Sequence, residues 1–425
     1  MILPEEFLRR MQKRLGEGFP AFLRTYEDAP CRGVRVNALK LSAEELKRFF
    51  PVGDQVAWEK NGFYSTQDKP GALPAYHAGL FYSQEPSAMC AAPLLDARPG
   101  ERVLDLCAAP GGKTTRLADA MKGEGVLVAN EYVYDRAKIL SQNVERLGIK
   151  NAAVISADTS LLAQRFASYF DKIIVDAPCS GEGMFRKDAG AVAEWSEENV
   201  EKCVVRQHKI LEDAACMLAG GGTLVYSTCT FESRENEEQI ASFLQRHPEF
   251  SLKEEHCLFP HEVRGEGHYA ARLVKEDAER ANAPLFVCEK NRAAERAYDD
   301  FSADFFVHAP KGELTTLSDG RMFLVTEEFP ALPGRVLRVG IEVGRFDGKR
   351  FTPAHALAMS ARCTQVRRVA ELGDEECRKW LRGETLEYAL PDGWGIVSWH
   401  GFPLGLMKAV GGTLKNHYPK GLREH

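Results

Sequence analysis

The 425-residue sequence lacks the segments that mark membrane-spanning, secreted and zinc-ribbon proteins. No window approaches the ~18 uninterrupted apolar residues that a membrane-spanning helix needs, and charges interrupt the N-terminal apolar residues too early for a signal peptide. The eleven cysteines never form C-x-x-C and are odd in number, which argues against a zinc ribbon and a secreted disulfide framework. We therefore expect a cytoplasmic protein with reduced thiols, no metal site and no membrane partner.

Low-complexity tracts and internal repeats are also missing, and the composition is that of a folded protein. Hydrophobic residues make up 44% of the chain and charged residues 27%, which excludes a wholly disordered chain. Single hydrophobic cores stop growing near ~250–300 residues. The length therefore predicts two to four domains.

An overall excess of basic residues is absent as well, because the formal net charge is -6. The charge is nevertheless uneven. Residues 1–80 hold 12 Lys and Arg against 10 Asp and Glu, residues 331–425 hold 15 against 10, and the rest of the chain is acidic. A cluster on the predicted first helix forms either a solvated face or a local patch for a polyanion; it consists of Arg9, Arg10, Lys13 and Arg14.

Between residues 100 and 230, short apolar runs alternate with loops and helical patterns, which is typical of a parallel sheet covered by helices. The predicted strands are residues 103–106, 126–130, 153–156, 172–175 and 223–226, with a later strand near 266–275. In open α/β sheets, ligands bind beyond the carboxyl ends of the strands. Residues in the loops that follow these strands are therefore the candidates for chemistry.

The first of these loops, in VLDLCAAPGGKTTRLA, joins a strand to a helix through small residues. Small residues let a ligand approach the backbone, and the start of a helix offers unpaired N–H groups. A nucleotide phosphate loop would need glycine at position 107, where this sequence has Cys107. A tight turn without a ligand is the other alternative for this segment alone.

Two acidic residues favour a nucleoside ligand. Glu131 follows the second strand, where α/β units place the carboxylate that binds ribose hydroxyls, and Asp158 follows the third strand, within reach of an adenine amino group. A single acid at such a position is more often a helix cap or turn residue. Two acids in register with the small-residue loop predict an adenosine-containing cofactor.

The fourth and fifth strands are followed by a carboxyl group and two thiols. Asp176 and Cys179 lie in DAPCSGEGMF, and Cys229 lies in YSTCTF. Carbon 5 of a pyrimidine becomes nucleophilic only after a thiolate adds to carbon 6 and the developing charge is stabilised, and a base must later remove the proton from carbon 5. Each cysteine singly is more often a packing residue. Together the three side chains indicate pyrimidine methylation.

CAAPGGK, DAPCSG and STCT, in this order, resemble the motifs of the Nop/Sun family of RNA cytosine-5 methyltransferases, which use S-adenosyl-L-methionine. RVNALK at residues 35–40 and HAGLFYSQEPSAM at 77–89 extend the resemblance over about residues 1–275. It implies that Cys229 is the nucleophile and that Cys179 helps to release the product. We further expect Asp176 to act at the N3 edge of the cytosine, either as a protonated donor or through a neighbouring residue. The resemblance also implies a set of cofactor contacts: Cys107, Ala108, Ala109, Pro110, Gly111, Gly112, Lys113, Glu131, Asp158 and Asp176.

The C-terminal third resembles the RsmF-type bacterial small-subunit rRNA methyltransferases, whose tails carry a PUA-like RNA-binding module. The matching segments are residues 393–395, 403–405 and 415–417. The tail also holds Lys408, Lys415, Lys420 and Arg423 among the aromatic residues Trp380, Trp394, Trp399 and Tyr418, many of which we expect in the core.

The resemblance implies an α/β fold whose Rossmann-like methyltransferase sheet has helices on both faces, flanked by a small N-terminal α+β domain and C-terminal α/β PUA-like domains. We expect the domain boundaries at 1–77 for N-terminal RNA binding, 78–275 for methyl transfer, 276–300 for a linker, 301–370 for an intermediate domain and 371–425 for the PUA-like module. The expected partner is RNA, either small-subunit rRNA or the assembling subunit, and the expected state is a monomer.

Three other functions remain open at this stage. Transfer RNA is an alternative substrate, because related enzymes with other appended domains modify it. A DNA cytosine methyltransferase would use the Pro-Cys thiol, here Cys179, and would not need Cys229. A non-catalytic ribosome-assembly protein would need neither thiol, and the intact pair argues against it.

Overall fold

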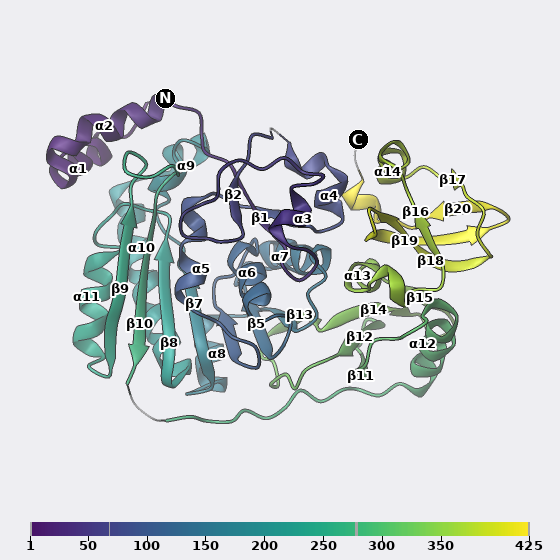
Figure 1. Ribbon diagram of the computed structural model, residues 1–425. Helices are drawn as coiled ribbons and strands as arrows, with labels where there is room; N and C mark the ends of the chain where they lie inside the picture. The colour runs from purple at the N-terminus through teal and green to yellow at the C-terminus, as the bar shows by residue number, and fades with distance from the viewer. Residues whose placement is uncertain (1, 68, 277–278, 424–425) are drawn as a thin grey trace.

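The computed structural model describes residues 2–67, 69–276 and 279–423, and its centre is an eight-stranded sheet (Figure 1). Strands β6, β5, β4, β7 and β8 run parallel, while β13, β10 and β9 are antiparallel to their neighbours. In spatial order the strands are β13 (Arg335–Val339), β6 (Ala152–Ser156), β5 (Val126–Asn130), β4 (Arg102–Asp105), β7 (Phe170–Asp176), β8 (Leu218–Thr228), β10 (His268–Lys275) and β9 (Phe250–Leu258).

The strand residues that point to either face of this sheet are apolar, so helices pack against both faces. Leu104 and Ile173 pack in one layer with α8 (Thr159–Arg165), α10 (Glu197–Met217) and α11 (Glu237–Arg246). Val103 and Ile174 pack in the other layer with α5 (Ala91–Leu94), α6 (Gly112–Ala120) and α7 (Tyr134–Arg146). The predicted Rossmann-like architecture is confirmed.

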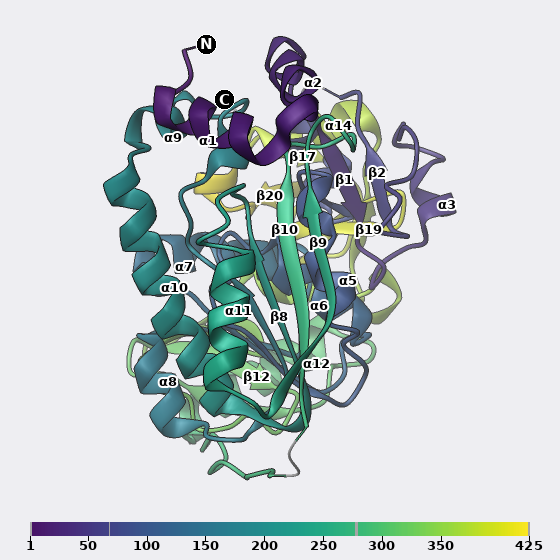
Figure 2. The same cartoon turned by 90° about the vertical axis from the view of Figure 1, so that its left-hand side faces the viewer.

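The N-terminal region contributes four short helices and a small antiparallel sheet. Its elements are α1 (Glu5–Leu15), α2 (Phe19–Arg24), β1 (Gly33–Val36), α3 (Ala43–Leu46), β2 (Gly62–Tyr64), α4 (Pro74–His77) and β3 (Phe81–Ser83). Phe7 and Met11 of α1 pack with Phe185 and Phe231, which lie in the loops after β7 and β8. Figure 2 shows α1 lying across the end of the central sheet.

The region after residue 300 is less separate from the central sheet than the sequence indicates. Its own sheet has the order β11-β12-β14-β15, but β13 leaves it and pairs with β6. Helix α12 begins at Arg292, inside the segment that we expected to be a linker, and buries Tyr298 and Phe305. The elements are α12 (Arg292–Phe305), β11 (Glu313–Thr316), β12 (Arg321–Val325), β14 (Ile341–Phe346), β15 (Phe351–Pro353) and α13 (His355–Ser360).

The C-terminal module is a five-stranded sheet packed against the N-terminal region. Trp380, Trp399 and Tyr418 belong to this core, as expected for most of the tail aromatics, while Trp394 is half-buried. The ring nitrogen Nδ1 of His77 lies 2.7 Å from the Tyr418 hydroxyl and joins the two regions. The elements are β16 (Val369–Glu371), α14 (Asp374–Leu381), β17 (Leu386–Glu387), β18 (Gly393–Trp399), β19 (Phe402–Val410) and β20 (Thr413–Asn416).

Across residues 2–67, 69–276 and 279–423, the model contains no helix with the length and apolar character of a membrane span.

Candidate active site

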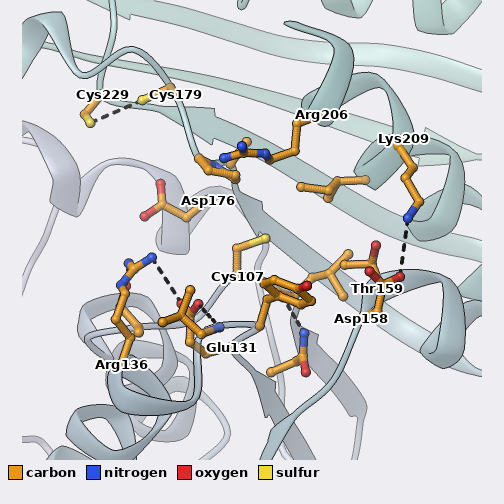
Figure 3. Close-up of a pocket in the computed structure, with 18 residues that line it drawn as sticks. Cys107, Glu131, Arg136, Asp158, Thr159, Asp176, Cys179, Arg206, Lys209 and Cys229 are labelled. Carbon is orange, nitrogen blue, oxygen red and sulfur yellow. Dashed lines mark hydrogen bonds and ion pairs between the residues drawn. The ribbon is translucent and has the colours of Figure 1, made fainter. Parts of the chain in front are cut away.

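A cavity of about 670 Å³ opens at the carboxyl ends of β4 to β8 (Figure 3). The thiol pair lies at one end and Asp158 at the other, with Asp176 and Cys107 between them. The lining residues are Leu106, Cys107, Ala109, Asn130, Glu131, Tyr132, Val133, Arg136, Asp158, Thr159, Asp176, Ala177, Pro178, Cys179, Arg206, Lys209, Ile210 and Cys229. The structure thus brings together residues from five strand ends that the sequence pattern placed at one edge.

The small-residue loop after β4 turns sharply into α6. Gly111 has φ +116°, in the region that favours glycine, and a Cβ there would lie 3.1 Å from Leu140 Cδ1. The loop is held from α7, because Asn143 Nδ2 donates to the Pro110 carbonyl at 2.9 Å and Arg136 donates to the Ala109 carbonyl at 3.0 Å. These bonds fix the backbone beside the cavity.

Glu131 and Asp158 are both aimed at this cavity but are held differently. Glu131 is almost fully buried, and its Oε1 accepts from the Val133 amide at 2.9 Å while Arg136 lies 3.5 Å from Oε2. Asp158 is half exposed and caps α8, since its Oδ1 accepts from the Ser160 amide at 2.9 Å. That hydrogen bond lowers the pKa of Asp158. Asp158 therefore serves as a helix cap and also presents an ionised carboxylate to the cavity.

Not all of the predicted cofactor contacts line the cavity. Cys107, Ala109, Glu131, Asp158 and Asp176 do so. The cavity lining does not include Ala108, Pro110, Gly111, Gly112 or Lys113, of which the last two begin α6. Two carboxylates flanking a narrow loop suit the ribose, the adenine and the backbone contacts of S-adenosylmethionine, so the residues present fit this cofactor.

Lys113 and Asp176 form an ion pair between the cofactor loop and β7, in which Lys113 is buried and Asp176 is one-third exposed. Lys113 Nζ lies 2.8 Å from Asp176 Oδ2, and Ser227 Oγ donates to Oδ1 at 2.9 Å. Burial favours the neutral carboxyl, but the ammonium of Lys113 outweighs it and lowers the pKa of Asp176. Likewise, burial opposes the charge on Lys113, yet Asp176 raises the pKa of Lys113. Asp176 is therefore an ionised acceptor, and the alternative of a protonated donor does not fit this environment.

His268 lies behind this ion pair. Its Nε2 is 4.0 Å from Asp176 Oδ1, and the residue is almost fully buried. Burial lowers the pKa of His268 to about 3, so its ring is neutral. The sequence analysis did not identify His268, because its position near the end of β8 follows only from the antiparallel pairing of β10 with β8, in which the next residue, Tyr269, is opposite Thr228.

The two thiols meet at the other end of the cavity. Cys179 Sγ and Cys229 Sγ lie 3.4 Å apart, and both residues are free cysteines. The hydrogen bond with Cys229, followed by burial, raises the pKa of Cys179. The loops are also joined through Ser180, whose Oγ lies 2.8 Å from Thr230 Oγ1 and whose amide donates to Glu235 at 3.0 Å. Cys179 therefore carries its proton at neutral pH, next to the Cys229 sulfur.

Basic residues on the cavity wall were missed by the sequence analysis. Arg136 of α7 and Arg206 and Lys209 of α10 line the cavity, and Figure 3 shows Arg206 between the thiol pair and Asp158. Arg136 follows Glu131 by five residues on the next helix, which is the one signal that could have identified it. Arg206 and Lys209 come from a helix that no chemical motif marked.

Half of the basic cluster on the first helix is engaged with the central region, while Arg9 and Lys13 are exposed. Arg10 pairs with Glu182 at 2.6 Å, and Arg14 Nη1 donates to Glu237 at 3.3 Å. Only about a fifth of each arginine side chain is exposed. The interpretation of this cluster as a polyanion patch is therefore wrong for Arg10 and Arg14, because acidic residues of the central region neutralise them.

Comparisons with known proteins cover nearly the whole chain. Residues 92–279 match the family 16S rRNA methyltransferase RsmB/F, and residues 3–86 match the N-terminal domain of 16S rRNA methyltransferase RsmF. Residues 300–360 match the RsmF rRNA methyltransferase first C-terminal domain, and residues 367–424 match the methyltransferase RsmF PUA domain.

Curated relatives share this arrangement. Proteins named ribosomal RNA small subunit methyltransferase F from Klebsiella pneumoniae and Cronobacter sakazakii are 35% and 34% identical to the chain, each covering 99% of it and 96% of the relative. Among solved structures, a methyltransferase homolog protein from Pyrococcus horikoshii is 29% identical, with TM-score 0.55 over 64% of this chain and 100% of that one. NSun6 from Pyrococcus horikoshii with SFG, 21% identical with TM-score 0.57 over 64% and 98%, shares the fold.

Proposed function

The chain belongs to the 16S rRNA methyltransferase RsmB/F family, whose cofactor is S-adenosylmethionine, and on this premise we propose that it methylates carbon 5 of a cytidine in small-subunit ribosomal RNA. The proposed reaction passes through a covalent adduct between Cys229 and carbon 6 of the base. The observation that carries the proposal is the 3.4 Å contact between Cys179 and Cys229 in the cavity that also holds Glu131 and Asp158. The whole-length likeness to small-subunit enzymes supports ribosomal over transfer RNA as substrate.

Cys229 is the proposed nucleophile because it directly follows β8 at the thiol end of the cavity. After the thiol releases its proton to solvent, the Cys229 thiolate attacks carbon 6, which forms the carbon–sulfur bond and moves an electron pair of the ring toward carbon 5 and the N3/O2 edge. Carbon 5 can then accept a methyl group. When bound, S-adenosylmethionine supplies that group as an electrophile.

Asp176 is proposed to hold the polar edge of the cytosine. Its carboxylate can accept from the 4-amino group, which selects cytosine over uracil. The Lys113 ammonium, 2.8 Å from that carboxylate and outside the cavity lining, keeps Asp176 ionised and places positive charge next to the site where negative charge develops. Both roles use the ionised forms that their shifted pKa values favour.

Cys179 is proposed to act after methyl transfer, when the proton on carbon 5 must leave. Its pKa is raised mainly by the hydrogen bond with Cys229. That bond is lost once the Cys229 sulfur is bonded to carbon 6, so the pKa of Cys179 falls. Cys179 then releases its own proton to solvent, and its thiolate accepts the proton of carbon 5. Loss of the proton returns the electron pair that expels the Cys229 thiolate and restores the aromatic ring.

Bisulfite sequencing of total RNA, from strains with and without the gene, tests the proposal. A cytidine of small-subunit rRNA should resist conversion only when the gene is present, and a copy carrying Cys229→Ala should not restore protection. Protection confined to transfer RNA would support the alternative substrate. An identical pattern in both strains would overturn the proposed activity.

A further inference from the structure

We propose that Arg10, on the N-terminal helix α1, is a positioning residue that holds the two thiol loops together. The proposal rests on the function proposed above, in which Cys179 and Cys229 act on the same base. Arg10 is 172 residues from Glu182 in sequence, yet it reaches the centre of the contact between the loops. No chemical motif includes it.

Arg10 pairs with one acid from each thiol loop. Its Nη2 lies 2.6 Å from Oε1 of Glu182, the third residue after Cys179. Its Nη1 pairs with Glu232, the third residue after Cys229. The side chains of Glu182 and Glu232 are 0% and 4% exposed, so each buried carboxylate needs a cation. Glu232 also pairs with Arg234 at 3.1 Å, and Arg10 also pairs with Glu197 at 3.1 Å, but Arg10 is the cation that the acids of the two loops share.

Glu182 itself connects the loops. Its Oε2 accepts from the Phe231 amide at 3.1 Å, which lies two residues after Cys229. Trp195 Nε1 donates to Oε1 at 3.0 Å, and the Arg10 guanidinium lies 5.2 Å from the centre of the Trp195 ring. Without Arg10, Glu182 would lose its ion pair and Glu232 would keep only Arg234, so we expect the contact between the two loops to weaken.

The apolar face of α1 reinforces the same contact. Phe7 packs edge-on against Phe185 at 5.0 Å between ring centres, and Phe22 of α2 packs against Phe231 at 5.5 Å. Phe185 belongs to the Cys179 loop and Phe231 to the Cys229 loop. The N-terminal helices therefore contact both loops through aromatic rings, and Arg10 places a positive charge between the acids of the two loops.

The proximity of the thiols can be measured without RNA or cofactor. In a buffer of reduced and oxidised glutathione, Cys179 and Cys229 are oxidised to a disulfide while one glutathione disulfide is reduced to two glutathione molecules. The effective concentration of one thiol for the other follows from this equilibrium. Non-reducing peptide mapping by mass spectrometry identifies the Cys179–Cys229 pair among the other cysteines.

Arg10→Met keeps much of the side-chain volume and removes the charge. We expect it to lower the effective concentration of the thiol pair about tenfold, and to lower kcat for methyl transfer about 10–100-fold with little change in the KM for RNA. Arg10→Lys should restore part of both values, because it retains the charge but cannot reach both carboxylates in the same geometry.

Arg9→Met is the matched control for the thiol equilibrium. Arg9 lies on the same helix, is 74% exposed and pairs with Glu6 of its own helix, so its loss should leave the disulfide equilibrium unchanged. Glu182→Gln provides a second variant if Arg10→Met does not fold. It breaks the ion pair while keeping the shape of the side chain, and should also weaken disulfide formation.

A normal thiol equilibrium in folded Arg10→Met or Glu182→Gln would overturn the proposal. A raised KM with a reduced salt dependence and unchanged kcat would make Arg10 an RNA contact instead, and would also overturn it. A weakened thiol equilibrium in a protein that methylates some other atom would refute the proposed reaction, but would leave the positioning role of Arg10 in place.

Discussion

The Cys179 and Cys229 sulfur atoms lie 3.4 Å apart although 50 residues separate them in sequence. Parallel pairing of β7 with β8 brings their loops to the same edge of the sheet, and the ion pairs of Arg10 lie just behind them. In this arrangement both thiols lie at one end of the cavity, where the proposed reaction needs them.

Asp158→Ser separates the two tasks of Asp158. Serine can still cap α8 through the Ser160 amide, whereas the charge toward the cavity is lost. We expect S-adenosylmethionine affinity to fall about tenfold. This corresponds to a loss of ~1.4 kcal/mol in binding free energy, which is the contribution of one good polar contact. Isothermal titration calorimetry measures this directly. Unchanged affinity would remove Asp158 from the cofactor site.

The pH dependence of Asp158 has a definite sign. Its pKa is lowered by the Ser160 hydrogen bond, so the carboxylate persists as pH falls toward and below the ordinary value of ~3.9. Cofactor affinity should therefore not titrate through this residue between pH 5 and 8. A carboxyl titration in that window which disappears in Asp158→Ser would contradict the assignment.

Lys113→Met should change the pH dependence of methyl transfer. The lowered pKa of Asp176 keeps the carboxylate ionised, and activity that needs it is lost only as pH falls through that low value. Removing the ammonium raises the pKa of Asp176, so the acid limb of kcat/KM should move toward neutral pH, with activity about 10²-fold lower. Single-turnover rates across pH test this.

Asp176→Asn is the matched control for that experiment, because it removes the titrating carboxyl itself. Its activity should be low, without an acid limb that depends on Lys113. An acid limb at the same pH in wild type and Lys113→Met would show that Lys113 does not set the ionisation of Asp176.

Lys408→Gln should weaken RNA binding in a salt-dependent way. Lys408 Nζ lies 5.7 Å from the centre of the Trp394 ring, and the ring centres of Trp394 and His417 are 4.4 Å apart. The PUA module therefore groups one cation with two rings. Loss of one phosphate contact should reduce the slope of log affinity against log salt by about one. Lys379→Gln, which removes a charge paired with Glu375 on α14, should leave the slope unchanged.

Arg338→Met should destabilise the whole central sheet. Arg338 on β13 is 3% exposed and lies 2.6 Å from Glu145 of α7, so its loss leaves a mostly buried carboxylate unpaired. Because Glu145 retains 20% exposure, we expect a loss of about 1–3 kcal/mol in the free energy of unfolding, measured in urea. Arg335→Met, on the same strand but exposed over Tyr134, should cost less than about 1 kcal/mol.

Hydrophobic periodicity and strand-end chemistry were enough to predict much of this protein. The five parallel strands fall where the apolar runs predicted them, because local pattern and burial agree there. The cavity contains Glu131, Asp158, Asp176 and both thiols because parallel strands end at one edge.

Long-range contacts account for what the sequence did not predict. The residue pattern of β13 is similar to those of β12 and β14, the strands before and after it in sequence. Only its pairing with the edge of β6 places it in the central sheet. The partners of Arg10 and the position of His268 beside Asp176 likewise depend on tertiary packing, for which no local pattern exists.

The central claim, that Cys229 attacks and Cys179 releases, is tested most directly by a denaturing gel. Cys229→Ala and Cys179→Ala proteins are incubated with cognate RNA and S-adenosylmethionine, and the gel is examined for a slow-migrating protein–RNA band. Cys179→Ala should give the band, because attack and methylation precede the missing step, while Cys229→Ala should give none and transfer no methyl group. A band with Cys229→Ala and none with Cys179→Ala would contradict the account and reverse the roles of the two thiols.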